Sequence, residues 1–456
     1  MAAIITTPLK RILISSLITD IKDVNTNRYY IGLGKSDDWN ETDTAPPPAD
    51  SILEERNTRH ALQAVKNVTD VSFVVGRTTW SSGAIYSAYS DNVVGQPTQS
   101  YYVITDSNEV YICLRQAKDA AGNPIVSTVK PFGTILTDFQ TADGYVWKFL
   151  YTISALDATK FLAANFLPVQ YITETTPNVS PIDQIQQETI QNAAVPGAII
   201  GFRVTSPGTG YTSAPSVTIT GDGTGAEATA TVSGGVISKI EVKDEAGKIV
   251  SGSGYTSAHV VIAGGGGTGA AASIVLGPTA GIGADPREDL RSTAIMLNTK
   301  PDGDESGEFT VDNDFRQVSI IKNPLTNTNT ALTSTSANAL RMLALSSTAT
   351  GFTPDNIIFG ITSGARAYVD KIDGDQVWYH QTEATGFAPF AEGEAIEEAD
   401  GGGSGVLEGT SADADSLAYL AASMDFLSGD MLYIDNRAAV SRSAEQQEDI
   451  KIIIQI

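Results

Sequence analysis

Apolar residues recur at three- and four-residue steps near the start of the chain, and much of the rest alternates between apolar and polar positions. Between residues 9 and 24 the apolar side chains fall on one face of a helix, separated by Lys, Arg, Ser and Asp. This spacing predicts an amphipathic helix. Further along, the alternating runs 101–104 and 110–114 flank a polar five-residue loop, which predicts a β-hairpin.

Two further runs predict buried strands. Residues 145–153 carry aromatic and aliphatic side chains on both faces of the expected strand, which is typical of the middle of a layered sandwich. Every even position of 450–456 is Ile, so we expect the end of the chain to be paired and buried. The patterns together predict a mainly β protein, a layered β-sandwich framework with a few helices.

A glycine-rich internal repeat interrupts this framework between residues 197 and 283. The motif at 208–214 returns at 252–258, and the motif at 223–226 returns at 267–270, each time 44 residues further along. Each copy contains two short alternating runs joined by a glycine turn. Two copies of one hairpin unit predict a small inserted β-module.

A second interruption lies within 340–418, where residues 357–365 are loosely echoed by 395–406. An Asp-Gly pair at 373–374, between apolar runs, predicts another hairpin there. We therefore expect one discontinuous framework that carries two inserted β-modules. The expected segments are a first framework segment (1–190), the Gly-rich module (191–284), a middle framework segment (285–339), the hairpin module (340–418) and a last framework segment with the C-terminal strand (419–456).

The charge balance excludes several classes of partner. The chain holds 29 Lys and Arg against 53 Asp and Glu, a net charge of −24. Binding to nucleic acids or to anionic membranes needs clustered cations, and the sequence shows no such cluster. Because like-charged copies repel one another, contacts within an assembly must be apolar, bridged by cations or made with basic neighbours.

Cysteine usage and targeting signals say little more. Cys113 is the only cysteine and lies in an apolar run, so we expect a small buried hydrophobic residue there. No stretch approaches the about 18 apolar residues of a membrane span, and the first residues do not follow the pattern of a secretory signal. These features predict a soluble chain made in a reducing cytoplasm.

Motifs that carry chemistry are sparse. Residues 267–272 match the dinucleotide fingerprint G-x-G-x-x-A, but strand-like alternation follows where a phosphate-binding loop needs a helix. The first repeat has the same pattern, so a repeated β-turn is the better interpretation, with nucleotide binding as the hypothesis to exclude. His60, His259 and His380 lie in unrelated contexts, which indicates structural or surface roles. We predict no enzyme and no cofactor.

One acidic loop has half of the spacing of a calcium site. Asp302, Asp304 and Ser306 match the first half of a calcium loop, whose twelfth position should be Glu and is here Asn313. A solvated connecting loop is the better interpretation. The same interpretation applies to residues 370–375.

Four runs of the framework occur in a distinctive order. They are 29–39 with the later 45–48, then 143–150, 315–325, and 428–437 followed by 450–456. In this order they resemble the baseplate wedge subunit of T4-like contractile-tailed bacteriophages, the product of gene eight. The resemblance covers the framework and skips both inserted modules.

The resemblance implies a structural protein without catalytic activity, mostly β, with a sandwich core of immunoglobulin-like topology. It implies a place in the tail baseplate of the virion, assembled in the host cytoplasm, with a homodimer in each wedge that contacts the other wedge subunits. The finished baseplate controls sheath contraction and DNA delivery. No cofactor, nucleic acid, membrane or small-molecule substrate is implied. The alternative is a tail or surface protein whose Gly-rich module binds a host glycan.

The motif residues are first interpreted as elements of the fold. Gly32 and Gly34 within a strand predict a bulge or a close backbone approach, Trp39 and Trp147 are expected in the core, and Pro324 is expected to end a strand. The sparse cations among these residues are candidates for salt bridges to a neighbouring subunit, or for solvated surface. The motif and possible interface residues are Arg28, Tyr30, Lys35, Trp39, Trp147, Phe315, Arg316, Asn323, Asn436 and Arg437.

Overall fold

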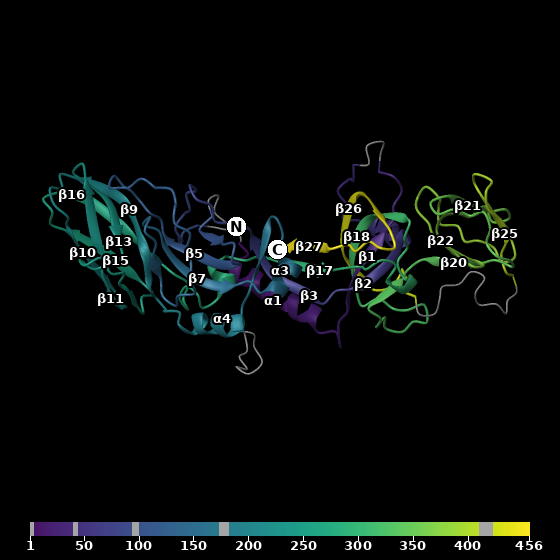
Figure 1. Ribbon diagram of the computed structural model, residues 1–456, viewed down its shortest axis with the longest axis horizontal. Coiled ribbons are helices and arrows are strands. Elements are labelled where there is room, and N and C mark those ends of the chain that lie inside the picture. The colour runs from purple at the N-terminus through teal and green to yellow at the C-terminus, as the bar shows by residue number, and fades with distance from the viewer. Residues whose placement is uncertain (1–3, 40–43, 94–99, 173–181, 410–422) are drawn as a thin grey trace. The chain divides into compact units, whose positions relative to one another are not determined.

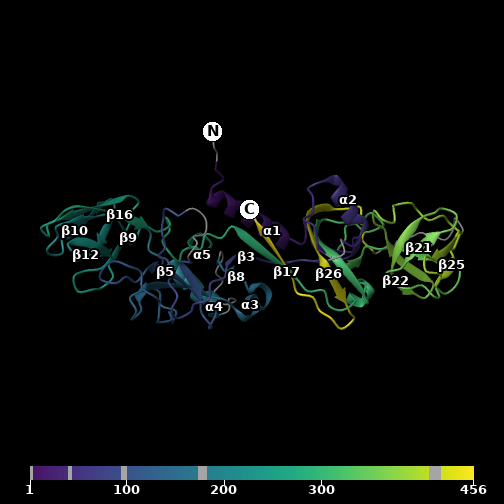
Figure 2. The ribbon, with the colours of Figure 1, turned by 90° about the horizontal axis from the view of Figure 1, so that it is seen from above.

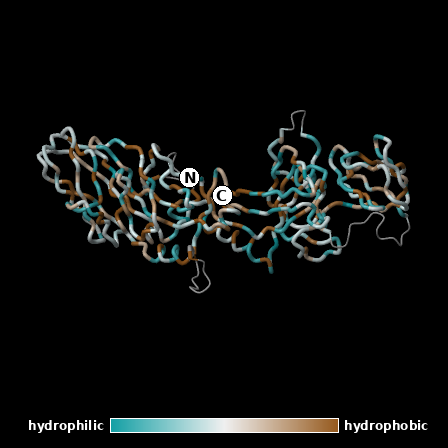
Figure 3. The backbone as a smooth tube through the Cα atoms, in the orientation of Figure 1, coloured by the Kyte–Doolittle hydropathy of each residue, from teal (hydrophilic) through white to brown (hydrophobic). Residues whose placement is uncertain are grey.

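The protein is mainly β in the computed structural model. The described residues are 4–39, 44–93, 100–172, 182–409 and 423–456. Strands take 40% of the structure and helices 11%, in several antiparallel sheets, which confirms the predicted fold class. Figure 3 shows hydrophobic and hydrophilic stretches interleaved along the backbone.

The chain divides into two compact units. The first contains Met1–Ser15, Ser72–Met296 and Ile453–Ile456, and the second contains Ser16–Val71 and Leu297–Ile452. The Gly-rich module belongs to the first unit, and the hairpin module belongs to the second. The five segment boundaries expected from the sequence stay a prediction.

The core sheet of the first unit has the strand order β4-β5-β7-β6, and Figure 1 labels its strands β5 and β7. Its strands are β4 (Tyr102–Ile104), β5 (Glu109–Arg115), β6 (Phe139–Gln140) and β7 (Val146–Thr152). The antiparallel pair β4 and β5 confirms the predicted hairpin. Six of the seven β7 residues are buried, so this strand is enclosed on both faces as predicted. Trp147 and Cys113 lie in the buried cluster of this sheet.

A further sheet has the order β27-β17-β3-β8. Its strands are β3 (Asp70–Gly76), β8 (Phe166–Val169), β17 (Ala294–Thr299) and β27 (Ile450–Gln455). The C-terminal strand is therefore paired, and Ile450 and Ile452 are buried. Ile456 is 38% exposed, so the prediction of a buried terminus is wrong for this residue, because the strand ends at Gln455.

The helices are short. They are α1 (Thr7–Lys22), α2 (Ile52–His60), α3 (Ala155–Phe161), α4 (Ile182–Asn192) and α5 (Pro286–Asp289). The predicted N-terminal helix is α1, on which Ile14 and Ile21 are buried while Ile12 is 65% exposed. Among the described residues, no helix combines the length and apolar composition that a bilayer crossing requires.

The Gly-rich module contributes three small sheets to the first unit. Their orders are β13-β12-β10-β15, β11-β14 and β16-β9. The strands are β9 (Ile199–Thr209), β10 (Ser216–Gly221), β11 (Thr224–Ala226), β12 (Thr229–Ser233), β13 (Val236–Glu241), β14 (Ser251–Ser253), β15 (Ala258–Ala263) and β16 (Thr268–Leu276). Figures 1 and 2 both show β9, β10 and β16 close together.

The two copies of the repeat are interlocked. Strand β10 of the first copy pairs with β15 of the second. Thr224 of the first copy pairs with Ser253 of the second. The equivalent residues, each 44 positions away in the other copy, also pair: Thr268 of the second copy with Thr209 of the first. The same pairing thus occurs twice with the copies exchanged. The prediction of a separate hairpin is wrong for the second copy, because β16 pairs with β9 of the first.

Glycine at two equivalent positions permits the strands of one copy to pair with those of the other. A Cβ atom on Gly267 would lie 2.5 Å from the ring of Tyr211, and one on Gly223 would lie 2.4 Å from the ring of Tyr255. Both tyrosines are buried. The glycine of the fingerprint-like run 267–272 therefore has a packing role, because Gly267 makes room for the Tyr211 ring. The run continues into strand β16, where a phosphate-binding loop would continue into a helix.

The framework sheet of the second unit has the order β19-β2-β1-β18-β26. Its strands are β1 (Tyr29–Gly34), β2 (Leu62–Asn67), β18 (Asn313–Lys322), β19 (Ser336–Asn338) and β26 (Asp430–Arg442). The register shifts between Leu33 and Gly34, and a Cβ atom on Gly32 would lie 2.6 Å from Ser319 Oγ. These features confirm the predicted bulge and close approach. Strand β18 ends at Lys322, before Pro324 as predicted.

The hairpin module forms a six-stranded sheet, β20-β23-β22-β21-β24-β25. The strands are β20 (Arg341–Ala344), β21 (Ile357–Gly360), β22 (Arg366–Asp373), β23 (Gln376–His380), β24 (Ala395–Glu398) and β25 (Ser404–Val406). The predicted hairpin is β22 and β23. The sequence similarity between 357–365 and 395–406 has a structural counterpart. Phe359 pairs with Arg366, and the residues 38 positions further along, Glu397 and Ser404, form the equivalent pair.

Candidate functional site

Three of the four motif runs meet in the framework sheet of the second unit. Strand β18 pairs with β1 on one side and with β26 on the other. The Gln317 side-chain amide donates to Asn436 Oδ1 at 2.9 Å. The indole N–H of Trp39 donates to the Arg437 carbonyl at 2.7 Å. The motif residues therefore hold one another together across strands that are far apart in the sequence.

Tyr30 and Phe315 are core residues of this sheet. Both are buried. The Tyr30 hydroxyl donates to the Ser334 carbonyl at 2.7 Å, and burial raises the pKa of this phenol to about 12. Because its hydroxyl is bound inside the protein, Tyr30 ties β1 to the segment before β19.

Arg28 and Asn323 close the end of the β1–β18 pair. The Asn323 N–H donates to the Arg28 carbonyl, and the Arg28 N–H donates to Asn323 Oδ1, both at 2.8 Å. Asn323 has a φ of 51°, a left-handed conformation that Asn adopts more readily than most residues. The motif therefore has Asn at the position where the chain turns after β18.

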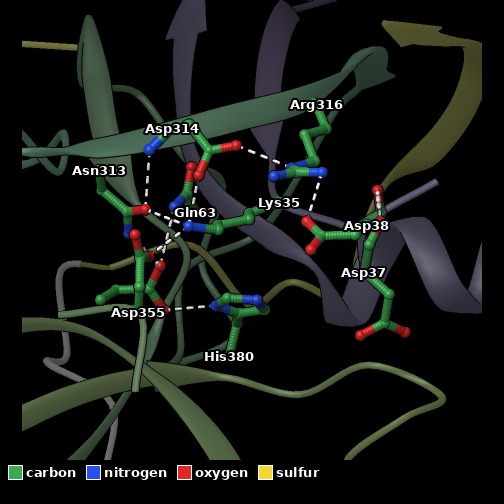
Figure 4. Close-up of polar contacts among 11 residues, drawn as sticks. Lys35, Asp37, Asp38, Gln63, Asn313, Asp314, Arg316, Asp355 and His380 are labelled. Carbon is green, nitrogen blue, oxygen red and sulfur yellow. Dashed lines mark hydrogen bonds and ion pairs between the residues drawn. The ribbon is translucent and has the colours of Figure 1, made fainter. Parts of the chain in front are cut away.

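Lys35 lies at the centre of a buried polar cluster (Figure 4). Its ammonium group donates to Asn313 Oδ1 at 2.5 Å and is 2.5 Å from an Asp314 carboxylate oxygen. It also pairs with Asp355 of the hairpin module. Lys35 is 8% exposed, so its charge is paired within the second unit.

Arg316 extends the cluster toward the surface. Its guanidinium is 2.8 Å from Asp314 Oδ2 and 2.5 Å from Asp38 Oδ1. Burial raises the pKa of Asp314, but Lys35 and Arg316 outweigh this effect and lower it below the usual value. The carboxylate is thus kept charged between two cations.

Asp370 joins the hairpin module to the framework sheet. Its Oδ1 accepts from Gln63 at 2.8 Å and from Asn313 at 3.1 Å, and its Oδ2 lies 2.6 Å from His380 Nδ1. Asp370 is only 1% exposed, so the prediction of a solvated loop is wrong for this residue. The prediction overlooked that β22 starts before residue 370 and carries this side chain into the interior.

The geometry of this cluster favours a structural joint. The His380 ring is buried, bound to Asp370 at one nitrogen and stacked on Tyr368 with ring centroids 5.4 Å apart. His380 Nε2 has no hydrogen-bond partner among the described residues, but three side chains are bonded to the Asp370 carboxylate, and a different packing would leave these groups unpaired as well. The cluster therefore fixes the hairpin module on the framework of the second unit.

The acidic loop at Asp302 is held by hydrogen bonds within the protein. The Asp304 carboxylate accepts from the Ser306 N–H at 3.1 Å, and Glu305 bonds both Lys66 and the Asp302 N–H. No group of three or more His, Cys, Asp or Glu side chains able to hold a metal occurs in the described residues.

The other predicted site residues differ in burial. Trp147 is fully buried, as expected of a core residue, whereas Trp39 is only partly buried, so the prediction of a core position is wrong for it. Arg437 is 50% exposed and lies 3.6 Å from Asp435. The Arg28 side chain is partly buried. Their role in an interface stays a prediction.

Sequence reasoning missed the members of the Lys35 cluster that lie outside the motifs. Gln63, Asp355 and Asp370 stand in separate segments, and no motif connects them. The one available signal was the placement of Asp370 directly after the apolar Val369, within an alternating run.

No protein-family model matches the chain, and no curated protein matches it.

Proposed function

We propose that this chain is a structural subunit of a phage tail baseplate wedge, which assembles with other wedge subunits into the baseplate that controls sheath contraction. The observation that carries the proposal is the ordered set of four framework motifs, 29–39, 143–150, 315–325 and 428–437. The fold supports it, because three of these runs form the adjacent strands β1, β18 and β26, and the fourth forms the buried strand β7.

The proposed role is mechanical. A wedge subunit transmits force through its contacts, so it needs regions whose packing does not change. The Lys35 cluster and the Asp370–His380 pair meet this need within the second unit. The interlocked repeats meet it within the first. Partners in this proposal are the other wedge subunits and a second copy of the chain.

Mass spectrometry of purified phage tails tests the proposal. We expect peptides from this chain in intact tails and in baseplates released from them, at the level of known structural subunits. A whole-cell lysate passed through the same purification, without tails, is the control. Tails that contain no trace of the chain would contradict the proposal.

Deletion of residues 197–283 separates this function from glycan recognition. A wedge subunit whose module only decorates the framework still assembles into tails that adsorb to the host. If deletion leaves assembly intact but abolishes adsorption, the glycan-binding alternative is correct.

A further inference from the structure

A cavity in the first unit lies between the core sheet β4-β5-β7-β6 and the Gly-rich module. Its volume is 260 Å³. Its walls come from the end of β5 and the loop after it, the turn between β6 and β7, and strands β9 and β13. Drug-sized ligands occupy pockets of about 300–1,000 Å³. A cavity just below this range suits a ligand of the size of a monosaccharide.

The charge of this cavity opposes the charge of the chain. The whole sequence has 29 basic and 53 acidic residues, yet the cavity lining has five cations and two carboxylates. These residues are Arg115, Lys118, Arg203, Lys239, Lys243, Asp143 and Glu241. Cations still outnumber carboxylates, five to four, when Asp91 and Asp138, the ion-pair partners of two lining arginines, are included. The lining residues and their ion-pair partners therefore carry a small net positive charge.

The two lining carboxylates are already engaged. Asp143 accepts hydrogen bonds from the loop before it, including the Thr128 N–H at 2.8 Å. Glu241 is shared by Lys239 at 3.1 Å and Lys243 at 2.8 Å, so two cations face one carboxylate. Burial raises the pKa of Glu241, but the two lysines outweigh it and hold the pKa below its usual value. Within the described part of the chain, this trio therefore carries one positive charge more than it has carboxylates.

Two basic side chains at the cavity, Arg203 and Lys118, each have an N–H group without a hydrogen-bond partner among the described residues. The terminal nitrogens of Arg203 bond Asp91 and Ser273, but its Nε is buried without a hydrogen-bond partner among the described residues. Lys118 is an exposed residue at the edge of the cavity, and its ammonium group has no ion pair or side-chain hydrogen bond within the same described ranges. A buried unpaired N–H is costly, so Arg203 gains a hydrogen bond if its side chain turns this group toward an anion in the cavity.

We propose that this cavity binds the carboxylate or phosphate group of a sugar-sized organic acid, with Arg203 and Lys118 as the donors that recognise the anion. Guanidinium and ammonium groups form short, charge-assisted hydrogen bonds with such oxyanions. Gln116 and Gln140 also line the cavity and carry amide oxygens that accept from sugar hydroxyls. The proposal rests on this cavity and is independent of the baseplate assignment.

Isothermal titration calorimetry of the full-length chain tests this site. The probes are glucuronate, glucose 6-phosphate and neutral glucose. We expect saturable binding of at least one acid, at least tenfold tighter than that of glucose. Tighter binding of glucuronate identifies a carboxylate site, and tighter binding of the phosphate identifies a phosphate site.

Variants show whether the cavity is responsible. Arg203→Gln and Lys118→Gln are each expected to weaken acid binding at least fivefold. Lys130→Gln removes an exposed lysine that pairs with Asp106 in the same unit, and it is the matched control with unchanged affinity.

A second variant keeps the test valid if a charge substitution disturbs folding. Gly201 lies two residues before Arg203 on β9, on the same face of the strand, and an added Cβ there meets nothing within 4 Å. Gly201→Leu is therefore expected to fill the cavity and abolish binding with little change in thermal stability. Equal affinity for glucose and the acids, no binding at millimolar concentration, or equal losses in Lys130→Gln and Arg203→Gln would overturn the proposal.

Discussion

Several charged residues of the four motif runs form their ion pairs inside the protein. Lys35 and Arg316 were candidates for salt bridges to a neighbour, and the structure pairs both with aspartates of the same unit. Charged groups that are buried in this way need their partners, because an unpaired buried charge is strongly unfavourable.

Removal of the Asp370 carboxylate should destabilise the second unit. Asp370→Ala leaves Gln63, Asn313 and His380 without their shared acceptor. We expect a loss of about 3–5 kcal/mol in the free energy of unfolding, measured by urea denaturation. Asp373→Ala, on the exposed turn of the same hairpin, should change it by less than about 0.5 kcal/mol. Equal effects of the two substitutions would disprove the role of Asp370.

His60 should make the second unit sensitive to acid. Its ring packs against Phe387 and Phe426, and burial, with Arg341 and Arg56 nearby, lowers its pKa from 6.5 to about 4. Between these two values the unfolded chain binds a proton that the folded chain does not. The free energy of unfolding should therefore fall as the pH drops through this window.

The variant His60→Leu isolates this effect. Urea denaturation at several pH values between 7 and 4 should show a shallower loss of stability on acidification than in the unsubstituted protein. Identical pH profiles would show that His60 does not titrate differently in the folded state.

At the scale of elements, periodicity predicted which strands exist but not all of their partners. The alternation at 101–104, 110–114 and 145–153 identified β4, β5 and β7, because a strand enclosed on both faces must be apolar on both. The pairing of β16 with β9 could not be predicted in this way. It depends on contacts between the repeats, and local sequence is compatible with either partner.

Glycine substitutions test the interlocked repeats. Gly267→Ala and Gly223→Ala each place a methyl group against a buried tyrosine ring, at 2.5 and 2.4 Å. Such overpacking costs about 1–3 kcal/mol, and the two variants should behave alike in thermal unfolding and in hydrogen exchange of the module. Gly201→Ala, which meets open space, is the matched control. Stability losses no greater than those of Gly201→Ala would contradict the exchange of strands between the copies.

The candidate site shows the same limit of sequence reasoning. Motif order predicted that β1, β18 and β26 belong to one framework, whereas the buried Asp370–His380 pair resembles ordinary loop and strand sequence. A polar side chain at an alternating position is compatible with either face until the register of the strand is known. Burial of Asp370 is therefore a property of the assembled sheet.

At the scale of the whole molecule, a net charge of −24 limits how copies of the chain and their partners meet. Like charges repel, so the partner surfaces should be more basic than this chain. Surface electrostatics is screened over about 10 Å at about 0.1 M salt and over about 3 Å at about 1 M.

Association with wedge partners should therefore weaken as the salt concentration rises. Sedimentation velocity of the chain mixed with candidate wedge subunits, at about 0.1 M and about 1 M NaCl, measures this directly. The chain alone is the control for changes in its own association. Complexes that are equally stable at both salt concentrations would count against electrostatic complementarity.

A cryo-EM map of the assembled contractile tail tests the central claim most directly. We predict density in each baseplate wedge that accommodates the framework sheet β19-β2-β1-β18-β26, with the Gly-rich and hairpin modules attached to their own units. A map in which other proteins account for all of the wedge density, with no place for this chain, would contradict the assignment.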